Sequence, residues 1–228
     1  MASLTWFGHS SFELNLNGSI ILFDPWFDQK PRQADRLVAP AVKNVDAIKR
    51  ADLIMVSHEH FDHCDPYDVT RIAQRTFATV VGPDETLANF PDISSRQKMS
   101  VEEGDSFSLH GLQVTVTPAR HPQSVHSVGF IVEKDGKSVY FAGDTYDFFE
   151  MGQIEVDVAL LPIGGTFTMD MYGALSAAKK IKAKFVVPMH FNTFERIHAD
   201  PHEFAKRLHS NNTRTVAKVL EIGQTLDF

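Results

Sequence analysis

The strongest constraint in this sequence is the run His58-Glu59-His60-Phe61-Asp62-His63, which follows the apolar segment 53–56. An apolar segment of this length predicts a buried strand, so the run would lie on a loop at the end of that strand. Imidazole nitrogens and carboxylate oxygens are donors that divalent transition metals accept. We interpret the run as part of a metal site, and a solvated polar loop is the alternative interpretation.

The pattern of apolar residues and turns predicts mixed β-sheets flanked by helices. Segments 4–16 and 19–23 are typical of two strands joined at Asn17-Gly18, a favoured hairpin dipeptide. β-rich segments between 106 and 142 predict an antiparallel meander, and strands then alternate with helices up to a closing pair of strands. This mixture predicts an α/β fold, with one domain over 1–228. The other expected elements are helices at 46–51, 66–75, 172–181 and 201–209, and strands at 53–56, 77–81, 106–109, 113–117, 127–133, 138–142, 156–161, 184–188, 215–220 and 225–228.

Three more residues that could bind a metal follow predicted strands elsewhere in the chain. His121 comes after segment 113–117, Asp144 after 138–142 and His190 after 184–188. A single histidine or aspartate in such a place is more often structural. Open α/β sheets place their ligands at the carboxyl ends of strands, so the repeated placement predicts a shared cleft at one sheet edge.

These residues, in this order, carry a resemblance to a known superfamily. His58-x-His60-x-Asp62-His63, His121, Gly143-Asp144-Thr145 and Pro188-Met189-His190 resemble the five-part signature of the metallo-β-lactamase superfamily. The segments Gly8-His9-Ser10-Ser11, Asp24-Pro25, 162–170 and 188–194 are similar to a small family of uncharacterised metal-dependent hydrolases within it.

The resemblance implies a four-layer αββα sandwich with two metal ions at one edge of the sheets. By matching positions, the first metal would be held by His58, His60 and His121, and the second by Asp62, His63 and His190. Asp144 would bridge the two ions, and Asp24 would orient the ligands, since ligating histidines usually donate their other N–H to a carboxylate or carbonyl. Asp62 is also the candidate catalytic residue that orients the water or carries its proton.

Several other residues are weaker candidates. His126 competes with His121 as the third ligand of the first metal, and we favour His121 because His126 adjoins the next strand. His9 has about equal support as a cleft residue and as a structural one. Cys64 is expected to be a small buried residue. Segment 164–169 suits a cleft wall, or a lead into a helix capped by Asp170. The candidates for orienting ligands or contacting substrate are Asp24, His9, His126, Thr166, Phe167 and Asn192.

Charge and composition narrow the partners. The formal net charge of −7 gives no general attraction to nucleic acid. No basic region followed by an apolar run resembles a signal peptide, and no segment has the roughly 18 apolar residues of a spanning helix. With Cys64 as the lone cysteine, we expect a cytoplasmic protein with a small-molecule substrate and no membrane or nucleic-acid partner, and a homo-oligomer is compatible with the sequence.

The expected function is a metal-dependent hydrolase that uses a dinuclear centre and metal-bound hydroxide on a small-molecule ester, lactone or phosphodiester. Zinc is the expected metal, and manganese, iron, cobalt or nickel would also suit these donors. The alternatives are a nuclease or phosphodiesterase acting on RNA or nucleotides, and a catalytically silent scaffold. A flavodiiron reductase is disfavoured because that class typically carries glutamate at the position of His60 and an attached flavin domain.

Overall fold

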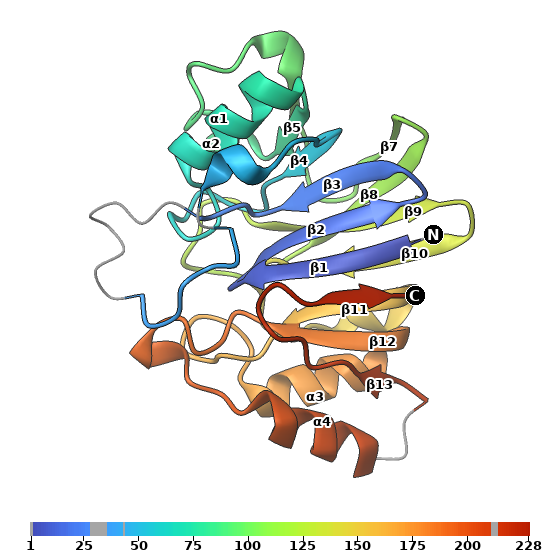
Figure 1. Cartoon of the computed structure of the whole chain (residues 1–228). Coiled ribbons are helices and arrows are strands. Elements are labelled where there is room, and N and C mark those ends of the chain that lie inside the picture. The colour runs from blue at the N-terminus through green and yellow to red at the C-terminus, as the bar shows by residue number, and fades with distance from the viewer. Residues whose placement is uncertain (1, 28–35, 43, 211–213) are drawn as a thin grey trace.

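Two mixed β-sheets lie face to face, with α1 (Pro66–Thr76) and α2 (Asp84–Leu87) covering one sheet and α3 (Met171–Lys180) and α4 (Pro201–Ser210) covering the other (Figure 1). The computed structural model describes residues 2–27, 36–42, 44–210 and 214–228. The four layers confirm the predicted α/β, αββα fold class.

The first sheet has the strand order β14-β1-β2-β3-β4-β5-β6, and the second has the order β13-β12-β11-β10-β9-β8-β7. Short 3₁₀ helices occur at Val45–Ala47, Ser95–Gln97, Phe149–Gln153 and Glu195–Ile197. The strands are β1 (Ala2–Gly8), β2 (Ser11–Leu16), β3 (Ser19–Phe23), β4 (Leu53–Met55), β5 (Thr79–Gly82), β6 (Lys98–Ser100), β7 (Ser106–Leu109), β8 (Leu112–Pro118), β9 (Val128–Lys134), β10 (Lys137–Phe141), β11 (Glu155–Pro162), β12 (Lys182–Met189), β13 (Val216–Ala217) and β14 (Thr225–Asp227).

Strand direction decides which loops share an edge. β1 and β3 each pair antiparallel with β2, and β3 pairs parallel with β4, so β1, β3 and β4 run the same way. In the second sheet β8 and β10 each pair antiparallel with β9, and β10, β11 and β12 are parallel, so β8, β10 and β12 also share a direction. β5 and β6 continue the parallel series after β4, and β13 continues the one after β12, so the carboxyl ends of five strands lie at one edge of each sheet.

Apolar packing joins the layers. The rings of Phe23 and Phe141 stack between the sheets with centroids 4.7 Å apart. Beneath α1, Val69, Ile72 and Ala73 are buried against the outer face of the first sheet. In β4 and along most of β11 the side chains on both faces of the sheet are buried, which accounts for the near-continuous apolar segments there.

Local capping residues fix where helices begin. Asp65 accepts hydrogen bonds from the backbone N–H groups of Tyr67 and Asp68 at the start of α1, and Pro66 occupies the first turn. Asp170 accepts from the N–H of Gly173 and caps α3, as predicted. Among the described residues, no helix is both long and apolar enough to cross a membrane.

Three expectations need correction, and two short elements were missed. The predicted strand 4–16 is two strands, β1 and β2, because the backbone turns at Gly8 (φ 110°) and His9 (φ 55°). The closing strands do not pair with each other: β13 joins β12, whereas β14 joins β1 in the opposite sheet. The helix expected at 46–51 is a single turn at Val45–Ala47. β6 and α2 were not predicted, because both are too short to show a clear period.

Candidate metal centre

Histidines and aspartates gather where strands of both sheets end. His9, Asp24 and His190 directly follow β1, β3 and β12, and all three have left-handed backbones, with φ of 55°, 40° and 54°. This conformation is unfavourable for residues other than glycine and tends to occur at functional sites. The left-handed backbone ends each strand and turns the side chain of the residue that follows it toward the shared edge.

Close approach of backbone segments also requires glycine beside the site. Gly143, before Asp144, has a φ of 59°, and an added Cβ would lie 2.9 Å from Ser57 Cβ. At Gly164 an added Cβ would lie 2.2 Å from the His190 carbonyl oxygen. Both contacts are closer than real Cβ atoms show, so these glycines allow segments of different strands to meet at the site.

His58, His60 and His121 form one group, which we call the first cluster. His60 Nδ1 lies 3.0 Å from His58 Nε2 and 3.2 Å from His121 Nε2. His58 and His121 are buried, and His60 is partly exposed. Three ring nitrogens from two different sheets therefore face one small space.

In each ring of this cluster, the nitrogen that points away from the other two rings has a hydrogen-bond partner, and that partner determines the tautomer. The Ser57 hydroxyl donates to Asp24 Oδ2, so its oxygen accepts from His58 Nδ1 at 2.9 Å. His121 Nδ1 donates to the Phe167 carbonyl, and His60 Nε2 donates to the Gln123 carbonyl. Each neutral ring has only one N–H, so the three inward nitrogens carry lone pairs. Lone pairs this close together suit a shared cation.

Asp62, His63, His190 and His9 form a second group, the second cluster. Asp144 lies between the clusters: its Oδ1 is 3.3 Å from His63 Nε2, and its Oδ2 is 3.2 Å from His190 Nε2 and 3.9 Å from His121 Nε2. The seven expected ligands thus come together, with Asp144 in contact with both clusters.

Asp24 supports the site from beneath. Its Oδ2 accepts from His63 Nδ1 at 2.6 Å and from the Ser57 hydroxyl at 2.6 Å, and its Oδ1 accepts from the Ser57 N–H at 2.8 Å. One buried carboxylate therefore orients His63 directly and His58 through Ser57, the orienting position expected for Asp24. Ser57 was not predicted, although it immediately precedes His58.

The electrostatics of the protein groups at the site favour a cation. Burial lowers the pKa of His58 and of His121, so both rings are neutral, the form in which imidazole can bind a metal. Burial also lowers the pKa of His63, but the charges of Asp144 and Asp24 outweigh it, and the net pKa is well above the usual value. Burial raises the pKa of Asp144, and His190 and His63 outweigh it, so this pKa is well below the usual value. The carboxylates of Asp144 and Asp24 therefore stabilise a second proton on the His63 ring, and a metal ion would replace that proton.

The donor atoms fit metal ions. Within the described chain, His63 Nε2, His190 Nε2 and Asp144 Oδ1 are buried with no hydrogen-bond partner. Two donors on one ion at bonds of about 2.1 Å lie about 3.0–3.4 Å apart at right or tetrahedral angles, and the separations above of 3.0–3.3 Å match this range. Buried donor atoms at these spacings without a hydrogen bond are the arrangement that a bound ion would satisfy.

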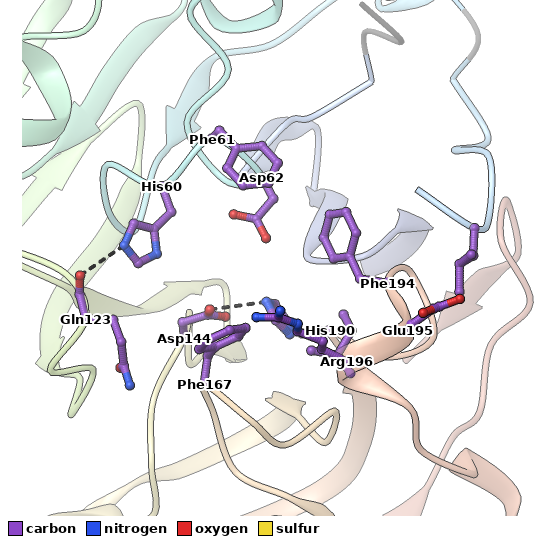
Figure 2. Close-up of a pocket in the computed structure, with 12 residues that line it drawn as sticks. His60, Phe61, Asp62, Gln123, Asp144, Phe167, His190, Phe194, Glu195 and Arg196 are labelled. Carbon is purple, nitrogen blue, oxygen red and sulfur yellow. Dashed lines mark hydrogen bonds and ion pairs between the residues drawn. The ribbon is translucent and has the colours of Figure 1, made fainter. Parts of the chain in front are cut away.

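A cleft of ≈ 770 Å³ opens onto the clusters (Figure 2). His60, Asp62, Asp144 and His190 line its base, so each cluster reaches the cleft. Apolar side chains form much of the wall, and they include Phe61 and Phe167, which are 42% and 38% exposed. The remaining lining residues are Leu37, Gln123, Phe194, Glu195, Arg196 and Ile197.

Some of the weaker candidates lie at the site and others do not. Phe167 lines the cleft and His9 lies in the second cluster. His126 lies outside both clusters, with Nδ1 3.6 Å from Glu85 Oε2. Thr166 donates through its hydroxyl to the Arg196 carbonyl, and Asn192 accepts from the Ala199 N–H, so both hold loops together. Cys64 is buried, as expected.

Comparison with known proteins agrees with this arrangement. The family model of the β-lactamase superfamily domain matches residues 3–190. The chain belongs to the metallo-β-lactamase superfamily. It is 37% identical over 238 residues to a UPF0173 metal-dependent hydrolase of Ignicoccus hospitalis, across 99% of this chain and 97% of that protein. A UPF0173 metal-dependent hydrolase of Methanopyrus kandleri is 32% identical over 240 residues, across 98% and 99% of the two chains.

A solved structure supports the same placement in the superfamily. Igni18, a novel metallo hydrolase from the hyperthermophilic archaeon Ignicoccus hospitalis, is 36% identical with a TM-score of 0.84, across 100% of this chain and 99% of that chain. This superfamily member is therefore a metal-dependent hydrolase, as its sequence motifs indicated.

Proposed function

We propose that this enzyme binds two divalent ions and hydrolyses an ester, lactone or phosphodiester of a small molecule that carries an apolar group. The observation that carries the proposal is the convergence of both clusters at the base of one apolar cleft. Such pairs of ions lower the pKa of a shared water and polarise a carbonyl or phosphoryl oxygen.

The first cluster would hold one ion through His58, His60 and His121, and the second would hold the other through Asp62, His63 and His190. Asp144 would contact both ions, since its two oxygens face different histidines. Imidazole and carboxylate donors without thiolate suit zinc and also admit manganese, iron, cobalt or nickel.

Asp62 is our candidate for orienting the attacking water or carrying its proton. Its side chain is 14% exposed, and it lies at the boundary between the buried second cluster and the cleft. A group in this position can contact both a bound ion and solvent, whereas the carboxylate of Asp24 is fully buried and is engaged by His63 and Ser57.

The cleft wall supports an apolar substrate group. Leu37, Phe61 and Phe167 are large apolar side chains that remain 58%, 42% and 38% exposed, and all three line the cleft. Exposed apolar side chains gathered around a polar centre are typical of small-molecule sites. Arg196 is the only cationic side chain among the described lining residues, so the wall offers little attraction to a polynucleotide. We also propose a cytoplasmic location, because a lone cysteine fits a reducing compartment.

The test begins with elemental analysis of protein purified without chelators, followed by removal and return of each metal. Reconstituted protein is then assayed with p-nitrophenyl esters of increasing acyl length, with lactones and with bis(p-nitrophenyl) phosphate. We expect two equivalents of metal, activity that depends on them, and higher kcat/KM for longer acyl groups. Absence of bound metal would falsify the proposal, and so would activity that survives its removal.

A further inference from the structure

His9 is a histidine of the second cluster to which the superfamily signature gives no role. It lies between β1 and β2, is 1% exposed and has a φ of 55°. Its ring is enclosed by Trp26, His63, His190 and Phe194, and the His190 centroid is 4.2 Å away. A buried imidazole in a strained backbone conformation is costly, so a specific interaction is expected to compensate for it.

Thr193 determines which nitrogen of His9 carries the proton. The Thr193 hydroxyl lies 3.0 Å from His9 Nδ1 and donates to the Phe191 carbonyl at 3.4 Å. The hydroxyl oxygen therefore accepts from His9 Nδ1–H. With the single N–H of a neutral imidazole placed on Nδ1 by this contact, Nε2 carries the lone pair. His58, His63 and His121 show the same arrangement, with Nδ1 held by a protein partner and Nε2 facing the site.

The lone pair at Nε2 faces a second electron-rich atom. His9 Nε2 lies 3.2 Å from Asp62 Oδ2, yet no hydrogen bond forms at this nitrogen with any described residue. His63 Nε2 and His190 Nε2 lie 3.3 and 3.2 Å from Asp144 oxygens, also without a hydrogen bond. All three pairs have the spacing of two donors on one ion.

We propose that His9 is a protein ligand of the second ion through Nε2, with Thr193 fixing its tautomer. This inference rests on the proposed metal centre. The second ion would then have His9, Asp62, His63 and His190 in addition to Asp144, whereas the first has three imidazoles and Asp144. The second ion is the more enclosed of the two, so the exchangeable position for substrate falls to the first.

Metal-bound nitrogens can be counted directly without changing the protein. Protein with ¹⁵N-labelled histidine is loaded with ¹¹³Cd²⁺, and one-bond coupling between ¹¹³Cd and ¹⁵N is recorded. We expect six coupled imidazoles, from His9, His58, His60, His63, His121 and His190, rather than five. Five would overturn the inference and leave the proposed function standing, because a hydrogen bond from His9 to Asp62 gives no such coupling. If no cadmium binds, the metal centre itself fails.

Variants test the same inference through affinity. Asparagine tolerates a positive φ and is too short to reach the ion, so His9→Asn should weaken binding of one of the two ions by at least about 10–100-fold. It should also remove one coupled imidazole signal. Wild-type affinity for both ions would contradict a ligand role for His9.

Thr193 provides a matched pair of variants. Thr193→Val removes the hydroxyl and should weaken the same ion by about 10-fold, whereas Thr193→Ser keeps the hydroxyl and should restore it. The control is His126→Gln, which alters a histidine outside both clusters and should leave both affinities unchanged. Equal affinities in the valine and serine variants would contradict a role for the Thr193 hydroxyl.

Discussion

The two clusters of the metal centre differ in donor type and in support. The first presents three imidazole nitrogens, and neutral oxygens of Ser57, Phe167 and Gln123 hold its rings. The second includes the Asp62 carboxylate, and the buried carboxylate of Asp24 holds His63. His60 of the first cluster is partly exposed, whereas His9, His63 and His190 of the second are buried.

This difference indicates that the two clusters would bind their ions differently. An ion among buried donors with negative charge beneath it is bound tightly, because burial strengthens its attraction to carboxylates. An ion held by neutral imidazoles beside an open cleft exchanges its remaining ligands more readily. We therefore expect the second cluster to retain its ion and the first to exchange ligands with substrate.

The largest effect is expected from Asp144→Ala, which removes the contact between the clusters. Activity should fall by about 10³-fold or more, because several kcal/mol of transition-state stabilisation depends on the ion pair. Steady-state kinetics and elemental analysis measure the effect, and circular dichroism controls for folding. Near wild-type activity in folded Asp144→Ala would show that the two clusters act independently.

His60→Ala breaks the first cluster alone. One equivalent of metal should be lost while the second remains, and activity should fall by about 10²-fold or more. Mass spectrometry under native conditions counts the bound ions. Loss of both ions together would contradict separate clusters.

Asp24→Asn weakens the support of the second cluster. Loss of an outer partner typically costs about 10–100-fold in metal affinity, and His63 contacts Asp24 directly at 2.6 Å. Titration against a competing chelator should show this loss at one ion and a smaller change at the other. Equal weakening of both would show that the Ser57 contact to His58 matters as much.

The clusters should also respond differently to pH. Without metal, the raised pKa of His63 means that its second proton is present at neutral pH and is lost only as pH rises through that pKa. Metal binding must release this proton. The metal affinity of the second cluster should therefore rise about 10-fold per pH unit above pH 6.5, until the pH reaches the pKa of His63.

Affinity at the first cluster should change little over this range, because burial keeps His58 and His121 neutral. Calorimetry in buffers of different ionisation enthalpy measures the protons released. Proton release from both binding steps, or from neither, would contradict the assignment.

The smallest effect concerns the cleft wall. Phe167→Ala removes a half-exposed ring and should raise KM for a long-chain ester about 5-fold with little change in kcat, because only apolar contact is lost. The control is Phe149→Ala, since Phe149 is 84% exposed and does not line the cleft. A fall in kcat without a change in KM would indicate instead that Phe167 acts by positioning His121 through its carbonyl.

The sequence by itself indicated a metal-dependent hydrolase and determined most of the elements. The run from His58 to His63, with His121, Asp144 and His190 after strands, predicted one shared cleft because parallel strands end at one edge, and the resemblance implied which of these residues would hold each ion. The antiparallel meander, the Asn17-Gly18 hairpin and α1 were also predictable, since their signals are local: apolar period, turn dipeptide and capping residue.

Only the tertiary structure decided which side chains meet across the sheets. The separation of β13 and β14 into different sheets depends on long-range packing, which no local pattern reports. The contact of His9 with Thr193 joins residues 184 positions apart. The left-handed φ of His9 ends a strand that its apolar pattern would have continued, and this one backbone angle turns the imidazole into the metal centre.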